Sequence, residues 1–143
     1  MAIDRQATGL AITRIFIGVF FLFEGLGKLR WFVNSSMLAA TLAHWHTGAG
    51  PASRWYLERV AMPGVTYFAR LVPLGEICSG VGLILGIWTP VFAVIAFLMA
   101  LNFHVAAGTI FQFAFLTNGY GLPVLGSTLG LAVGGVRLPW SIR

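Results

Sequence analysis

The sequence predicts an all-α protein, a polytopic membrane four-helix bundle, and three observations support this fold class. Of the 143 residues, 58% are hydrophobic and 9% are charged, whereas soluble proteins average about 45–50% apolar and about 25% charged residues. No Asp, Glu, Lys or Arg occurs from Ile77 to Val136. Four segments are also long and apolar enough to cross a bilayer. This composition excludes a soluble enzyme, a disordered tail and a typical nucleic-acid-binding protein.

Each predicted span has the roughly 20 apolar residues that a hydrocarbon layer of about 30 Å requires. The spans cover residues 7–29, 65–87, 90–111 and 119–138. The first could instead be a cleaved signal peptide, but the residues after its apolar core contain no small-x-small cleavage site, so we interpret it as a retained helix. The length of the chain favours a single domain, residues 1–143.

The connection between the first two spans is long, and we expect two short helices in it. Asn34-Ser35-Ser36 are residues that favour a helix start, and Gly48-Ala49-Gly50-Pro51 separates this helix from a second one at about residues 52–61. Amphipathic aromatic rings, which favour the headgroup level, recur here: Trp31, Trp45, Trp55 and Tyr56. We therefore predict interfacial helices, with a compact cap over the bundle as the alternative.

Several polar side chains fall within the predicted spans, where ionisable groups are costly and usually pair inside the bundle. They are Arg14, Glu24, Lys28, Arg70, Glu76, Asn102 and His104. Helix rise places Arg14 near the depth of Glu76, and Glu24 near that of Arg70. Lys28 is a second candidate partner for Glu24, because it lies four residues later on the same helix.

These residues allow two interpretations. In the first, they are ion pairs that hold the first two spans in register. In the second, they form a polar site in the membrane, where Glu76 or His104 bonds to or protonates a quinone-like headgroup.

His104 allows a further hypothesis, because a neutral imidazole can ligate the iron of a haem or the magnesium of a chlorophyll. The sequence offers no second axial ligand, and a hydrogen-bonded packing histidine is the favoured interpretation. His44 and His46 do not share a helix face, so we predict no metal site there. Cys78 has no partner for a disulfide and is interpreted as a small apolar residue.

Glycines recur every fourth residue in two of the predicted spans, a spacing that lets helices approach closely. These are Gly82 and Gly86 in the second span, and Gly126, Gly130 and Gly134 in the fourth. The fourth span either packs within the bundle or docks onto a neighbouring subunit.

Two short motifs resemble those of the DoxX-like family. Arg14-Ile15-Phe16-Ile17-Gly18 with Gly25-Leu26-Gly27-Lys28-Leu29 is similar to the R-x-x-x-G…G-x-x-K-L first helix of that family. Glu76, Gly80, Leu83 and Gly86 fill its second signature, E-x-x-x-G-x-x-L-x-x-G. The resemblance covers roughly the whole chain, although the third and fourth spans match by architecture alone.

The resemblance implies a small multi-pass protein of a bacterial or archaeal inner membrane. One branch of the family, DoxD, is a subunit of thiosulfate:quinone oxidoreductase, and other relatives associate with membrane redox or oxidative-stress proteins. Among the charged residues, Arg14, Lys28 and Glu76 occupy signature positions. This sequence has no cysteine pair for sulfur chemistry.

These observations together predict a non-catalytic accessory subunit of a larger, quinone-linked membrane electron-transfer complex. The alternatives are a quinone-reactive oxidoreductase subunit that uses the buried Arg/Glu layer, and a haem- or chlorophyll-holding subunit that uses His104. The expected small molecules are lipid and a quinone, with no covalently bound cofactor. The distribution of basic residues favours cytoplasmic termini.

Overall fold

In the computed structural model the described residues, 4–142, form helices and connecting segments without a strand. Three helices are long: α1 (Arg5–Gly27), α4 (Val65–Leu85) and α5 (Thr89–Ala107). The shorter elements are η1 (Leu29–Phe32), α2 (Ser36–Thr47), α3 (Pro51–Tyr56), the π-helical turn η2 (Leu57–Ala61), α6 (Phe113–Thr117) and α7 (Leu122–Gly134).

The long helices α1, α4 and α5 are long and apolar enough to cross a membrane, as predicted for the first three spans. The fourth predicted span, 119–138, contains α7, which has 13 residues. At about 1.5 Å per residue α7 is about 20 Å long, which is shorter than the span expected from composition. The predicted span is apolar as far as Val136, but its backbone is helical only over Leu122–Gly134.

The helix ends have local causes. Asp4 caps α1 by accepting hydrogen bonds from the backbone N–H groups of Gln6 and Ala7, as an N-cap carboxylate does. Helices α4 and α5 end at Gly86 (φ 73°) and Gly108 (φ 68°), in the left-handed region that glycine tolerates. Two consecutive glycines, of low helix propensity, end α7 at Gly134.

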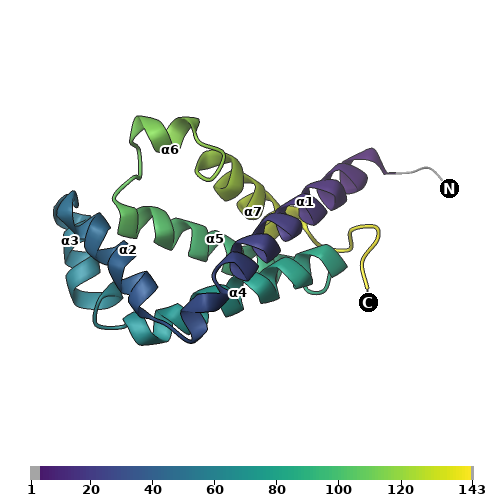
Figure 1. Cartoon of the computed structure of the whole chain (residues 1–143). Coiled ribbons are helices and arrows are strands. Elements are labelled where there is room, and N and C mark those ends of the chain that lie inside the picture. Colours follow the sequence, from purple (N-terminus) through teal and green to yellow (C-terminus); the bar gives the residue numbers. More distant parts are fainter. Residues whose placement is uncertain (1–3, 143) are drawn as a thin grey trace.

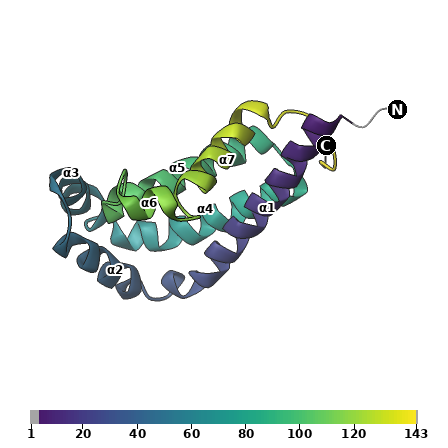
Figure 2. The same ribbon diagram turned by 90° about the horizontal axis from the view of Figure 1, so that it is seen from above.

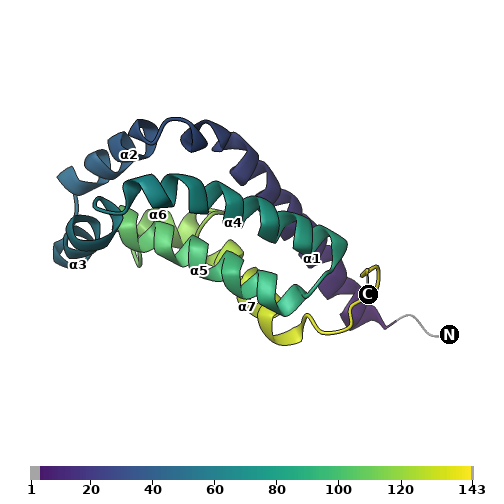
Figure 3. The same ribbon diagram turned by 90° about the horizontal axis from the view of Figure 1, so that it is seen from below.

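Helix α4 lies between α1 and α5, and α7 packs against α5 and meets α1 (Figures 1 and 3). The N-terminal end of α1 and the C-terminal segment lie at one end of the bundle, and α2 and α3 lie at the other (Figure 1). The main core consists of small and aliphatic side chains with two phenylalanines: Ala11, Phe21, Leu83, Ala93, Ala96, Ala100, Phe115, Val124, Leu125, Leu131 and Leu138.

Glycines let α1 and α4 approach until their backbones touch. A methyl group added at Gly80 of α4 would lie 2.5 Å from the backbone nitrogen of Leu22. One added at Gly25 of α1 would lie 2.9 Å from the carbonyl oxygen of Pro73 and 2.9 Å from the nitrogen of Ile77. These distances leave no room for a side chain, so the glycines fix how α1 crosses α4.

The long connection after α1 contains helices that pack onto the far ends of α4 and α5 (Figure 2). A second apolar cluster joins them: Leu38, Leu42, Leu57, Ala61, Ala69 and Ala106. The buried Ser53 hydroxyl donates to the carbonyl of Ala106, 2.8 Å away, and the Tyr56 hydroxyl donates to Asn102. Burial raises the pKa of Tyr56 above its ordinary value. This packing has the form of the cap that the sequence offered as an alternative.

Candidate functional site

An ionic cluster links α1 to α4 inside the bundle. The Lys28 ammonium lies 2.8 Å from Oε2 of Glu24, and 2.8 and 2.9 Å from Oε1 and Oε2 of Glu76. Only 4% of the Glu76 side chain and 16% of the Lys28 side chain are exposed. Such a cluster is stable in a low-dielectric interior only when its members pair and satisfy one another's hydrogen bonds.

The backbone explains why these three side chains meet. Glu24 and Lys28 are one helical turn apart on α1, which places them on one face. Gly25 lies on the backbone of α4 at Pro73 and Ile77. Glu76 precedes Ile77, so the close contact at Gly25 brings its carboxylate to the ammonium of Lys28.

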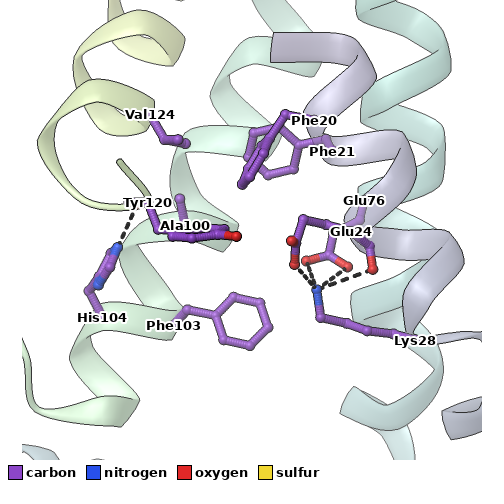
Figure 4. Close-up of a pocket in the computed structure, with 10 residues that line it drawn as sticks. All are labelled: Phe20, Phe21, Glu24, Lys28, Glu76, Ala100, Phe103, His104, Tyr120 and Val124. Carbon is purple, nitrogen blue, oxygen red and sulfur yellow. Dashed lines mark hydrogen bonds and ion pairs between the residues drawn. The ribbon is translucent and has the colours of Figure 1, made fainter. Parts of the chain in front are cut away.

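A cavity of about 210 Å³ adjoins the cluster (Figure 4). Its polar wall is the Glu24, Lys28 and Glu76 cluster, and aromatic and aliphatic side chains from α1, α5 and the start of α7 form the rest. These further lining residues are Phe20, Phe21, Ala100, Phe103, His104, Tyr120 and Val124. The Lys28 ammonium lies 5.3 Å from the centre of the Phe103 ring, within cation–π range. The cavity therefore combines one charged wall with a mostly aromatic enclosure.

His104 fastens the loop before α7 to α5. Its Nε2 lies 2.8 Å from the carbonyl oxygen of Tyr120, and its Nδ1 lies 3.0 Å from the Thr109 hydroxyl. A carbonyl only accepts, so Nε2 carries a proton and donates it to the carbonyl of Tyr120. A metal ion could bind either nitrogen only by displacing a hydrogen bond. His104 thus positions Tyr120 at the cavity.

The predicted partners of Glu24 and Glu76 are partly wrong. The Glu24–Lys28 pair forms, but Glu76 pairs with Lys28 and not with Arg14. Arg14 is fully buried, and its guanidinium donates to the Ser141 hydroxyl and, over 2.8 Å, to the carbonyl oxygen of Trp140. The C-terminal segment folds back onto α1 and supplies these two oxygens, while the buried Nε of Arg14 has no hydrogen-bond partner among the described residues.

Arg70 and Asn102 also lie away from the cavity. The Arg70 guanidinium is exposed and donates to the carbonyl of Thr66, 3.0 Å away on its own helix, so the predicted Glu24–Arg70 pair does not form. Asn102 accepts from Tyr56 on the side of α5 that faces α3. Glu24, Lys28, Glu76 and His104 are the predicted site residues that the fold brings together.

The predicted glycine positions fall into two groups. Gly82 lies against the Phe92 ring, and Gly86 lies against the Arg14 guanidinium and Ser141, so both serve packing within the chain. Gly126 and Gly130 are exposed on α7 and have no other part of the described chain within 4 Å of an added methyl group. Gly134 lies 3.2 Å, by the same measure, from Leu10.

The aromatic lining of the cavity was not predicted. Phe20 lies one turn before Glu24 on the same face of α1, and Phe103 directly precedes His104, which is a usable signal. Tyr120 gives no such signal, because the segment before α7 must fold back to place it.

Among the described residues, no group of three His, Cys, Asp or Glu side chains lies close enough to hold a metal ion. The imidazole of His46 instead lies 2.8 Å from Glu58.

The comparison with family models decides the assignment. The DoxX model matches residues 9–113. The chain belongs to the DoxX family. The match to DoxX spans α1 to the start of α6 and includes Glu24, Lys28 and Glu76, whereas Tyr120 and Val124 lie beyond it. No curated protein and no solved structure matches the chain.

Proposed function

We propose that this DoxX protein is an accessory subunit of a quinone-linked membrane electron-transfer complex, and that its cavity binds the ring of a quinone or hydroquinone. The observation that carries the proposal is the cavity of about 210 Å³, bounded by Glu24, Lys28 and Glu76 on one side and by aromatic rings on the other. Cavities of about 150 Å³ accommodate a benzene ring. The redox centre that exchanges electrons with the ring belongs, in this proposal, to a partner subunit.

The outward face of α7 supports an accessory role. Gly126 and Gly130 are open to the surroundings, and large apolar side chains, Leu122, Leu129 and Val133, are exposed on the same helix. Small residues beside apolar ones let a neighbouring membrane helix approach closely. In this proposal α7 is the surface on which the partner subunit packs.

The proposed membrane placement follows the basic residues and the aromatic rings. The chain lies in the inner membrane of a bacterium or archaeon, with α1, α4 and α5 spanning it, the shorter α7 returning the chain through it, and both termini in the cytoplasm. Helices α2 and α3 then cover the opposite surface, where Trp55 and Tyr67, both exposed, lie at the headgroup level. Labelling of Arg5→Cys and of Arg54→Cys from each side of vesicles, each in a Cys78→Ala background, tests this orientation.

The ligand proposal is tested with the purified full-length chain in lipid nanodiscs. The probes are a decyl-substituted benzoquinone and its hydroquinone, and calorimetry measures binding. Glu76→Gln keeps the size of the side chain but weakens the cluster, and we expect at least tenfold weaker binding of the probe that the unmodified protein binds. Glu58→Gln changes an exposed carboxylate far from the cavity and should leave binding unchanged.

Absence of binding for both probes to the unmodified protein overturns the ligand proposal. The accessory role is tested separately, by mild solubilisation and mass spectrometry of what co-purifies with the chain. Gly130→Leu should release the partner, whereas Gly9→Leu, at another open glycine, should not. Retention of the partner by Gly130→Leu contradicts the assignment of α7 as the contact surface.

A further inference from the structure

The hydrogen-bond donors around the cavity are almost all engaged. Lys28 has three N–H bonds, and four oxygen atoms surround them: Glu24 Oε2, Glu76 Oε1 and Oε2, and the backbone carbonyl oxygen of Glu24 at 3.3 Å. The N–H of His104 points to the carbonyl of Tyr120. Neither group has a proton to offer to a ligand without breaking a bond within the protein.

In the ionic cluster beside the cavity, hydrogen-bond acceptors outnumber hydrogen-bond donors. Two carboxyl groups face the one ammonium of Lys28, so the cluster has a net charge of −1 when both carboxyl groups are ionised. The second oxygen of Glu24, Oε1, receives no hydrogen bond from any residue in the described range 4–142, and 36% of the Glu24 side chain is exposed. An ionised carboxylate accepts hydrogen bonds and donates none. The polar wall is therefore suited to a ligand that donates.

On the opposite side, Tyr120 is the residue with a hydroxyl among the described residues that line the cavity. Its ring extends across the cavity toward the carboxylates (Figure 4), and its hydroxyl makes no hydrogen bond with the described part of the chain. A phenol hydroxyl both donates and accepts, so Tyr120 suits either redox form of a ring. Glu24 is the group that distinguishes the reduced form of the ring from the oxidised form.

A surface groove lies beside the cavity. The groove, of about 370 Å³, is lined by Phe16, Ile17, Phe20, Gly119, Tyr120, Pro123, Val124 and Ser127. Phe20, Tyr120 and Val124 line both spaces, so the two adjoin at these residues. The groove runs between α1 and the start of α7, where its mostly apolar lining suits a hydrocarbon chain.

We propose that the cavity selects a single-ring hydroquinone with an apolar tail over the corresponding quinone, and that Glu24 is the specificity-determining residue. This inference rests on the proposed function and adds the redox form of the ligand to it. One hydroxyl of the ring donates to Glu24, the ring lies among Phe20, Phe103 and Tyr120, and the tail leaves along the groove. A quinone carbonyl in the same position faces a carboxylate and gains no hydrogen bond from it.

The test compares three ligands on the full chain in nanodiscs: the decyl hydroquinone, its benzoquinone, and the hydroquinone with both hydroxyls methylated. Methylation removes the donors without changing the oxidation state. A hydrogen bond to a charged group is strong enough for a tenfold preference. We therefore expect the hydroquinone to bind at least tenfold more tightly than either of the other two ligands.

Glu24→Gln supplies an amide N–H in place of the carboxylate, and it should abolish the preference or reverse it in favour of the quinone. Glu58→Gln is the matched control and should keep the preference. Equal or tighter binding of the quinone to the unmodified protein overturns this inference and leaves the proposed function intact. Binding of none of the three ligands overturns both. A preference that survives Glu24→Gln contradicts the role of Glu24.

Discussion

Two cations, the buried Arg14 within α1 and the half-buried Lys28 at its C-terminal cap, have very different surroundings. Arg14 and Lys28 are 14 residues apart, about four helical turns, and so lie on the same face of α1. Arg14 binds a serine hydroxyl and a backbone carbonyl of the C-terminal segment, whereas Lys28 binds two carboxylates beside a cavity. The first cluster closes the end of the bundle, and the second borders an accessible space. A basic residue in an apolar span thus indicates a polar contact inside the bundle. Whether this contact forms part of a binding site depends on the groups that the residue binds.

The largest expected effect comes from Lys28→Met, which leaves the carboxylates of Glu24 and Glu76 facing each other without a cation. Removal of one member of a buried ion pair costs about 3–5 kcal/mol, and we expect a loss of this size in the free energy of unfolding. Unfolding in mixed detergent micelles measures it. The double variant Lys28→Met/Glu76→Gln should recover part of the loss, and a single variant as stable as the unmodified protein contradicts the ionic cluster.

A smaller effect is expected at the helix contact that positions both clusters. Gly80→Ala places a methyl group 2.5 Å from the Leu22 backbone nitrogen, and such overpacking costs about 1–3 kcal/mol. The same unfolding measurement applies. Gly126→Ala, at an open position of α7, is the control and should not destabilise the protein. Equal stability of the two variants argues against the close crossing of α1 and α4.

Arg14→Met tests whether the contacts of Arg14 are independent of the ionic cluster at Lys28. It removes two hydrogen bonds to the C-terminal segment but also relieves the desolvation of a charge, so the net loss should be about 1–2 kcal/mol. Cleavage after Arg137 by trypsin in detergent should accelerate, because residues 138–142 lose their anchor. Binding of the hydroquinone should not change. Weaker ligand binding by Arg14→Met would show that Arg14 contributes to the site. It would contradict the separation of the two clusters.

The smallest effect is expected for Ser141→Ala, which removes the neutral hydroxyl that Arg14 contacts while leaving the carbonyl of Trp140 in place. We expect a loss of about 0.5–1.5 kcal/mol, measured by the same unfolding assay. Ser127→Ala on α7 is the control, because its hydroxyl makes no hydrogen bond to the described residues. A loss as large as that of Lys28→Met contradicts the difference between the two regions.

Composition was sufficient to predict the helical fold and the three long apolar helices, because lipid requires continuous apolar helices of bilayer length. The Glu24–Lys28 pair was also predictable, since a four-residue spacing fixes two side chains on one helix face. The partner of Glu76 was not predictable from depth alone. Depth along the membrane does not specify how helices are rotated about their axes, and the contacts at Gly25 and Gly80 set that rotation.

The spacing of apolar residues could not predict the hydrogen-bond partners of Arg14 or the residue at which α7 ends. Arg14 donates hydrogen bonds to Trp140 and Ser141, which lie 126 and 127 positions later in the chain, and a comparison of neighbouring spans does not include such distant residues. Hydropathy continues past Gly134, but the Gly134-Gly135 pair and the left-handed backbone of Arg137 (φ 57°) end the helix. The position of Tyr120 could not be predicted for a similar reason, because a loop and not a helix face brings it to the cavity.

The short α7 has a consequence for the surrounding bilayer. A helix of about 20 Å does not match a hydrocarbon layer of about 30 Å, and lipids beside such a helix accommodate the mismatch by local thinning. For the membrane placement proposed above we therefore expect headgroups and water to come closer to Tyr120, at the groove before α7, than to the long helices. An amphiphile with a polar ring, such as the proposed ligand, is then expected to reach the groove from the headgroup region.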